Sequence, residues 1–150
     1  MSPNPGVLQG LTMEEAAIDR VLEENGVGVL SMALDGTPYS IPMSFGYASD
    51  DTLYVLLAGP SEAGKKMEFA AESETAQFLV YDVAGDDEWE SVIVSGPIDR
   101  ITPEEWDSAR EAMVDNAYRP DLVTRIDVQS DPRVWSIDIE TKSGRAMGTE

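Results

Sequence analysis

Two of the three lysines in the chain, Lys65 and Lys66, are neighbours. They follow a Gly-Pro-Ser loop and begin a helix that we expect over about residues 65–72. A helix N-terminus presents free amides and the positive end of the helix dipole, whereas lysine is normally favoured at the C-terminus. The placement therefore indicates an anionic ligand, most simply a phosphate. The alternative is a pair of surface lysines that balance the charges of Glu62 and Glu68. The spacing GPSEAGKK does not match a P-loop, so nucleotide hydrolysis is not expected.

The segment YSIPMSFGY, residues 39–47, alternates between large apolar and small residues. This period of two predicts a strand with its large side chains on one face, toward a core. The opposite face then carries only small side chains, such as Ser40 and Ser44, so a flat ligand can lie close to the backbone. The alternative is a half-exposed antiparallel strand whose polar face is small. Pro42 removes a backbone donor, which disfavours a strand paired on both edges at that point.

Trp89 and Ser91 begin another expected strand, next to the acidic loop 85–88. Tryptophan is enriched at interfaces, so Trp89 is interpreted as a wall for an aromatic ligand or a partner subunit; the alternative is a plug at the end of a barrel. The acids of the loop do not have the spacing of an EF-hand, and a solvated loop is the preferred interpretation. No metal site is expected.

Composition excludes several kinds of chemistry. The chain of 150 residues contains no histidine and no cysteine, which excludes histidine-based triads, thiolate metal sites, disulfides and cysteine nucleophiles. Its net charge of −19 disfavours binding to nucleic acid. An acidic coat with so few lysines is typical of a cytoplasmic protein from an extreme halophile, because molar salt screens the repulsion between like charges; the alternative is an ordinary acidic protein.

The elements that must position these residues follow from hydrophobic periodicity and from turn and cap signals. Thr12 and Glu15 form a predicted capping box, as do Thr102 and Glu105, and Gly26 is expected to end the first helix. Asp35-Gly36 is a strong hairpin turn. The expected strands are 27–34, 39–47, 52–58, 75–83, 89–101 and 133–140, and the expected helices are 12–25, 65–72 and 102–117. Short turns make most of the strands antiparallel, so the predicted fold is mainly β, a six-stranded β-barrel with peripheral helices.

A chain of this length predicts one domain, residues 1–150. Residues 1–10 are expected to be a flexible N-terminal arm, and residues 102–132 a helix and irregular insertion before the last strand. The chain contains no apolar run of membrane-spanning length, and its start does not resemble a signal peptide. We therefore expect a cytoplasmic protein that binds neither nucleic acid nor membranes.

The order and spacing of these segments resemble a known family. The segments are a DG hairpin, TPYSIPMSFGY, TLYVLLA, GKKMEFAAES, AQFLVYDV, WESVIVSG and a terminal VWSIDIETKSGR. In this order they are similar to the pyridoxamine 5′-phosphate oxidase-like, FMN-binding split-barrel superfamily. In that family a six-stranded antiparallel barrel dimerises, and each FMN lies between the two subunits.

The resemblance implies which residues form the cofactor site. The strand residues Tyr39, Ser40, Ile41, Pro42, Met43 and Ser44 would flank the flavin, with Ser44 near the ribityl chain. Lys65 and Lys66 would bind its phosphate. Trp89 and Ser91 would close the site from the neighbouring strand, across the homodimer.

The implied function is that of an FMN-binding protein and flavin-dependent oxidoreductase acting on a small molecule of unknown identity. Pyridoxal phosphate synthesis is not expected, because Tyr39 and Ser44 stand where the true oxidases have arginine and lysine. The alternatives are a reductase that uses coenzyme F420, a non-catalytic flavin carrier or sensor, and a barrel that serves only as an interaction module. No catalytic residue is assigned.

Overall fold

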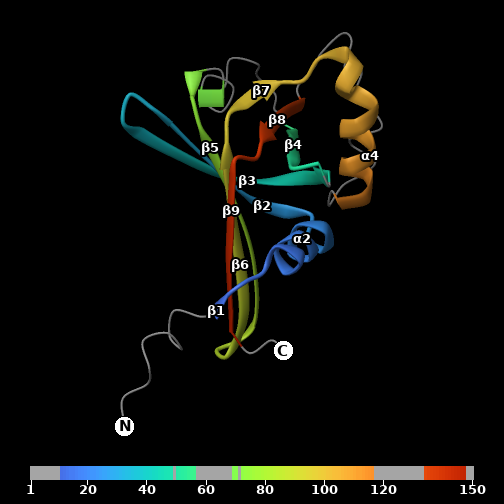
Figure 1. Ribbon diagram of the computed structural model, residues 1–150. Helices are drawn as coiled ribbons and strands as arrows, with labels where there is room; N and C mark the ends of the chain where they lie inside the picture. Colours follow the sequence, from blue (N-terminus) through green and yellow to red (C-terminus); the bar gives the residue numbers. More distant parts are fainter. Residues whose placement is uncertain (1–10, 49, 57–68, 71, 117–133, 148–150) are drawn as a thin grey trace.

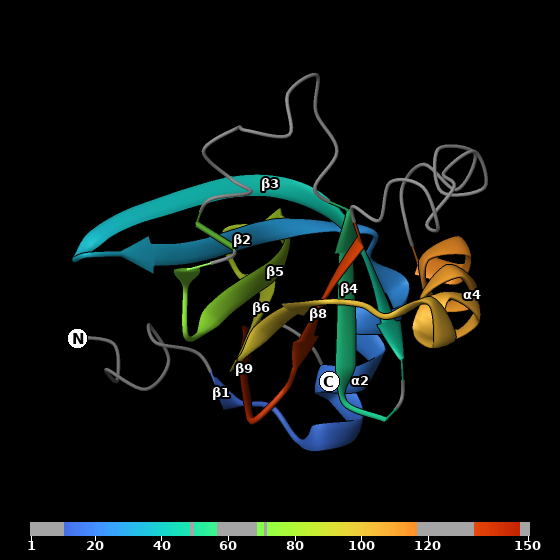
Figure 2. The same cartoon turned by 90° about the horizontal axis from the view of Figure 1, so that it is seen from above.

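The computed structural model describes residues 11–48, 50–56, 69–70, 72–116 and 134–147 (Figure 1). Its strands form a single antiparallel sheet of nine, in the order β1-β9-β6-β5-β2-β3-β4-β8-β7. The strands are β1 Leu11–Thr12, β2 Val27–Leu34, β3 Thr37–Ala48, β4 Thr52–Leu56, β5 Ala76–Gly85, β6 Glu88–Gly96, β7 Ile98–Arg100, β8 Val134–Asp138 and β9 Thr141–Met147. The sheet curls around an apolar interior (Figure 2), and this is the predicted mainly β, split-barrel fold.

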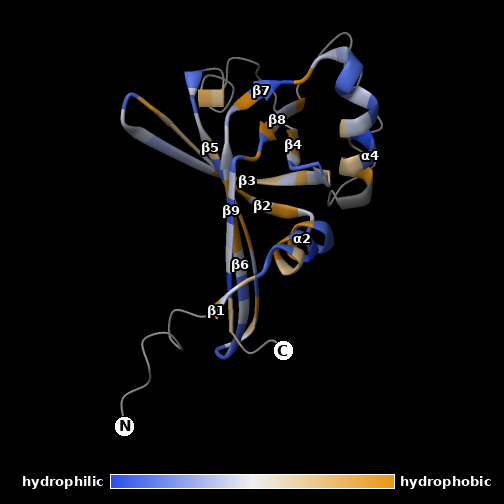
Figure 3. Ribbon diagram, in the orientation of Figure 1, coloured by the Kyte–Doolittle hydropathy of each residue, from blue (hydrophilic) through white to orange (hydrophobic). Residues whose placement is uncertain are grey.

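Among the described residues, the helical elements with defined bounds are α2 Glu15–Glu24, the 3₁₀ turn η1 Pro103–Glu105 and α4 Trp106–Asn116. Each helix combines hydrophilic and apolar stretches (Figure 3), because one side of it packs on the sheet. In α2 the buried stripe consists of Ile18, Val21 and Leu22. In α4 the buried residues Ala109 and Met113 pack in a second apolar cluster with β4 and β8.

The predicted cap at the start of α2 is wrong. Thr12 lies in β1, opposite Arg145 of β9, and the Met13 amide donates to the Gly144 carbonyl at 2.9 Å. Pairing with β9 holds this backbone extended, so the helix begins only at Glu15. At the other end the Asn25 side chain donates to the Val21 carbonyl at 2.8 Å, and this residue, rather than a glycine in a left-handed conformation, ends the helix.

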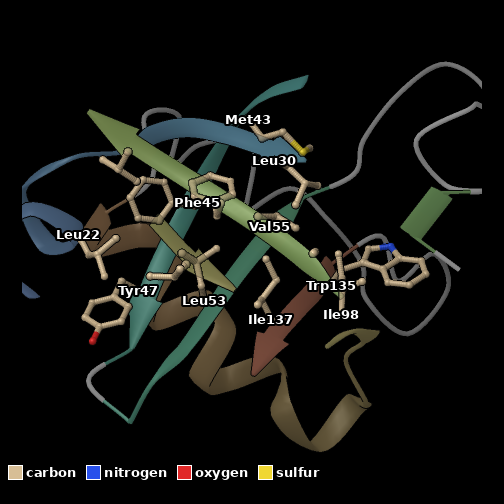
Figure 4. Packing of buried hydrophobic residues seen from close by; sticks show 14 of the residues in the cluster. Leu22, Leu30, Met43, Phe45, Tyr47, Leu53, Val55, Ile98, Trp135 and Ile137 are labelled. Atoms are coloured by element: carbon tan, nitrogen blue, oxygen red, sulfur yellow. The ribbon is translucent and has the colours of Figure 1, made fainter. Parts of the chain in front are cut away.

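Four other local predictions are confirmed. β2 spans the predicted residues 27–34, and Asp35 and Gly36 have φ of 51° and 81°, as a two-residue hairpin turn requires. Thr102 and Glu105 form both hydrogen bonds of the second capping box. In β3 the large residues face the interior as expected, with Met43, Phe45 and Tyr47 buried among the residues of Figure 4.

The predicted strand 89–101 is divided into β6 and β7 at Pro97, which lacks an amide proton. β6 pairs with β5 and β9, whereas β7 pairs with β8. The last predicted strand is also divided: β8 ends at Asp138, and β9, which the sequence analysis missed, continues as far as Met147. The two breaks let the chain pass from one half of the curled sheet to the other. The predicted helix 65–72 and the segments 1–10 and 117–133 fall largely or wholly outside the described residues.

Candidate functional site

Strand register defines a face of the sheet that points away from α2. Val29 lies opposite Pro42 of β3 and Leu79 of β5, and Leu79 lies opposite Ile93 of β6. Directly paired residues of antiparallel strands point to the same side of a sheet. The same side of the sheet continues over β4, β8 and β7, where it carries Asp138 and Asp99. We call only the part on β1, β9, β6, β5, β2 and residues 37–44 of β3 the outer face. It consists of Thr12, Val27, Val29, Ser31, Ala33, Pro38, Ser40, Pro42, Ser44, Gln77, Leu79, Tyr81, Val83, Trp89, Ser91, Ile93, Ser95, Thr141, Ser143, Arg145 and Met147.

The other face is covered by α2. Arg20 of α2 forms an ion pair with Glu90 of β6 at 3.1 Å, and Lys142 of β9 forms one with Asp19 of α2 at 3.1 Å. In Figure 1 both α2 and α4 lie on the same side of β6 and β9. The central part of the outer face is thus left without a helix in the described part of the chain.

The outer face differs from the rest of the surface in charge and polarity. None of its residues is acidic, although Asp and Glu make up 29 of the 150 residues of the chain, and its one charged residue is Arg145. It also carries most of the exposed large apolar side chains of the described residues. These are Val27, Tyr81, Val83 and Ile93, at 43%, 57%, 63% and 42% exposure. Exposed apolar side chains gathered on an acid-free face make the outer face the candidate binding surface.

Five residues of the predicted cofactor site point to the outer face, in two groups that β2 and β5 separate. Ser40, Pro42 and Ser44 project from β3, where the Ser40 hydroxyl lies 2.9 Å from that of Ser31. Trp89 and Ser91 project from β6, where they lie opposite Val83 and Tyr81 of β5. Residues that are distant in the sequence therefore share one face of the sheet.

The other predicted site residues are placed differently. The side chains of Tyr39, Ile41 and Met43 point to the interior side of β3, where Tyr39 stacks on Phe69 with ring centroids 5.1 Å apart. Only their backbone can therefore contact a ligand on the outer face. Lys65 and Lys66 lie outside the described residues.

One edge of β3 at the predicted site, here called its free edge, pairs with no strand among the described residues. Residues 37–44 pair with β2 on one side, and the pairing with β4 begins only at Phe45. Over residues 37–44 the second edge of β3 pairs with no strand that the structure describes. Among the described residues this agrees with the expectation from Pro42, and it makes the backbone amides and carbonyls on this edge candidates for contact with a ligand.

A polar network that the sequence analysis missed lies on the α2 side. The Tyr47 hydroxyl donates to Asp19 at 2.7 Å, and the Lys142 ammonium donates to Asp19 at 3.1 Å and to Asp51 at 2.7 Å. Burial, with the Asp19 hydrogen bond, raises the pKa of Tyr47. Burial alone would lower the pKa of Lys142, but the hydrogen bonds to Asp51 and Asp19 outweigh it and raise that pKa. Both groups keep their protons at neutral pH, so this network ties α2 to β3 and β9 rather than transferring protons.

The described residues contain no cluster of three or more acidic side chains arranged to hold a metal ion. No helix in the same part of the chain is long and apolar enough to cross a membrane.

Comparison with solved structures gives the same fold. A FAD-binding protein from Mesorhizobium loti is 26% identical, with a TM-score of 0.71 over 92% of this chain and 98% of that one. The FAD-binding protein of Mycobacterium smegmatis is 18% identical, with a TM-score of 0.62 over 91% and 97%. The FAD- and heme-binding protein of the same organism is 14% identical, with a TM-score of 0.67 over 91% and 72%.

No curated protein matches the chain. The family model described as pyridoxamine 5′-phosphate oxidase, in contrast, matches residues 14–146, from the start of α2 almost to the end of β9. The match covers the whole of the outer face except Thr12 and Met147. The chain therefore belongs to the pyridoxamine 5′-phosphate oxidase family.

Proposed function

We propose that the protein binds a flavin, FMN in the first place, on the outer face between two copies of the chain, and acts as a flavin-dependent oxidoreductase. The observation that carries this proposal is the outer face itself. It carries no acid and exposes several apolar side chains, and the residues predicted on β3 and β6 to contact the cofactor point to it.

The residues present fit a flavin. The isoalloxazine ring is flat and largely apolar, and Ser40, Pro42 and Ser44 offer it a surface without bulky side chains beside the free edge of β3. Trp89 offers an aromatic wall on the same face. Lys65 and Lys66 would hold the phosphate. The bound flavin would supply the hydride or electron transfer, and the protein would supply its position and electrostatic surroundings.

The distribution of charge on the surface supports a second copy of this chain as the other side of the binding site. Two molecules that each carry a net charge of −19 repel one another over most of their surface. The outer face is the part of the described surface on which two copies can meet without opposing carboxylates. A two-fold axis places the same face on both sides of a contact. The acidic remainder of the surface suits a cytoplasm of high salt, where such repulsion is screened.

Flavin binding is tested by titrating the purified protein in high salt with FMN, FAD and coenzyme F420, following the quenching of ligand fluorescence. Ser40→Leu places a bulky side chain under the proposed ring and should weaken flavin binding about tenfold or more. Thr37→Leu is the matched control, because Thr37 is exposed on the same strand but points to the other side. If the two variants bind the flavin with equal affinity, β3 is not part of the binding site. If the protein binds F420 but not FMN, the cofactor is F420.

A second measurement separates an enzyme from a carrier. The protein loaded with FMN is mixed with NADH or NADPH without oxygen, and the flavin absorbance is followed before and after an acceptor is added. Reduction followed by reoxidation supports an oxidoreductase. A bound flavin that no donor reduces would indicate a carrier or sensor.

A further inference from the structure

The side chain of Tyr39 points away from the outer face and contacts a segment that is distant in the sequence. Its ring stacks on that of Phe69, with the centroids 5.1 Å apart and the ring planes at 30°. Phe69 is 6% exposed and Ala70 is 1% exposed, so this segment packs into the main apolar cluster. Tyr39 therefore joins β3 to the residues that follow Lys65 and Lys66 in the chain.

A hydrogen bond joins the same segment to the β2–β3 hairpin at a second point. The Ser73 hydroxyl donates to the Ala33 carbonyl of β2 at 3.0 Å, and the Ser73 amide donates to the Phe69 carbonyl at 2.8 Å. Ser73 is itself buried, at 8% exposure. Because a buried hydroxyl is costly without a partner, this bond holds Ser73 at one place on β2. We call Tyr39, Phe69, Ser73 and the Ala33 carbonyl the clamp.

The clamp and the proposed ring surface lie on opposite sides of β3. Tyr39 and Ser40 are neighbours in β3, and successive side chains of a strand point to opposite sides of a sheet. Lys66 and Lys65, proposed to hold the flavin phosphate, come three and four positions before Phe69 in the sequence. Three residues of chain span at most about 11 Å, so a fixed Phe69 limits how far these charges can lie from β3.

We propose that Tyr39 is a positioning residue for the flavin phosphate. Its ring holds Phe69, and through Phe69 it holds the segment that brings the two lysines to the site. This inference rests on the proposed function and adds to it how the ring end and the phosphate end of the site are kept at a fixed separation. A site whose parts are held in place before binding loses less conformational freedom when the ligand binds.

The test measures the dissociation constants of FMN and of riboflavin, which lacks the phosphate, in high salt. Tyr39→Leu removes the stacked ring and should weaken FMN binding about tenfold, with riboflavin binding changed less than about twofold. Tyr39→Phe keeps the ring and should retain the wild-type affinity for both. Tyr54→Leu is the matched control, because Tyr54 is an equally aromatic residue, 3% exposed, in the second apolar cluster. It should leave both affinities unchanged.

Ser73→Ala tests the clamp at its second point, because it removes the bond to Ala33 and keeps the aromatic stack. It should weaken FMN binding about threefold and again spare riboflavin, and it carries the test if Tyr39→Leu does not fold. Hydrogen exchange of a peptide covering residues 64–73 is followed by mass spectrometry without flavin. It should be faster in Tyr39→Leu and Ser73→Ala than in the wild type and Tyr54→Leu.

The outcomes separate this inference from the proposed function. If the wild type binds FMN but the clamp variants lose FMN and riboflavin equally, or lose neither, the inference is overturned and the proposed function stands. Unchanged hydrogen exchange in both variants would also overturn the inference, because the clamp would not hold the segment. A wild type that binds neither flavin would reject the proposed function, and the role of Tyr39 toward the flavin phosphate with it.

Discussion

At the scale of single residues, two basic side chains of β9 have different surroundings. Lys142 is surrounded by carboxylates, at 2.7 Å from Asp51, 3.1 Å from Asp19 and 3.3 Å from Glu15. Arg145, three positions later, points to the opposite face and has no acidic partner there. The alternation of β9 alone causes this difference, because successive side chains of a strand point to opposite sides. Lys142 therefore links β9 to α2, whereas Arg145 forms no ion pair with the described residues.

The Tyr47–Lys142 network predicts how stability depends on pH. The pKa values of both groups are raised above their ordinary values of 10.0 and 10.5, so the folded protein keeps protons that the unfolded chain loses. The free energy of unfolding should therefore be constant below about pH 9.5 and fall as the pH rises through 10 and above. Urea denaturation between pH 8 and pH 11 measures this.

The variant Tyr47→Phe removes one of the two titrating groups, so its stability should fall less steeply with pH above pH 10. Tyr39→Phe is the matched control, because the Tyr39 hydroxyl has no hydrogen bond to the described residues and its ring stacks on Phe69 in either form. A Tyr47→Phe variant with the same slope as the wild type would show that Tyr47 titrates alike in the folded and unfolded states.

At the scale of elements, close approach to glycine decides where α4 packs. A Cβ atom at Gly46 of β3 would lie 2.5 Å from the Met113 amide nitrogen and 2.6 Å from the Ala112 carbonyl carbon of α4. These are backbone atoms, so they cannot move aside as a side chain can. The second apolar cluster, in which Met113 and Ala112 meet Tyr54, depends on this contact.

We expect Gly46→Ala to lower the free energy of unfolding by about 2–3 kcal/mol, because it forces α4 away from the sheet. Gly85→Ala is the control: its Cβ would meet nothing within 4 Å, so the change should stay within about 0.5 kcal/mol. Chemical denaturation of both variants in the same salt gives the comparison. Equal stabilities would mean that α4 is not seated on β3 in solution.

At the scale of the whole molecule, the distribution of acids organises the surface. The acids of the described residues lie in turns, on the helices, on the α2 side of the sheet and on β7 and β8, and the outer face carries none. Under the proposed function, mutual repulsion would favour contacts through that face over the acidic remainder of the surface. Association and cofactor binding would then share a single surface.

The proposed dimer is tested by placing an acid on the outer face. Ile93→Asp, at a residue 42% exposed, should convert the dimer to a monomer in sedimentation equilibrium and abolish flavin binding. Val114→Asp adds the same charge at a residue 41% exposed on α4 and should change neither property. Two variants of equal mass in solution would reject this face as the interface.

Local chemistry made much of this structure predictable from the sequence. The alternation of residues 39–47, the Asp35-Gly36 turn and the Thr102–Glu105 capping box depend on neighbours in the chain, and the structure contains all three. The cap at Thr12 was predicted wrongly because the backbone of Thr12 pairs with β9, which is distant in the sequence. β9 itself was missed because its segment TKSGRAM has no apolar alternation: its interior side is filled by Gly144 and Ala146, which fit beneath α2.

The sequence by itself determined the chemical types available to the site: no histidine or cysteine, scarce bases, and a strand with one small-residue face. Only the tertiary structure decided that Ser40, Ser91 and Arg145 lie on one acid-free surface and that Lys142 lies behind it. The physical reason is strand register. Pairing between strands distant in the sequence sets which side each residue faces, and a shift of one position would exchange the two faces.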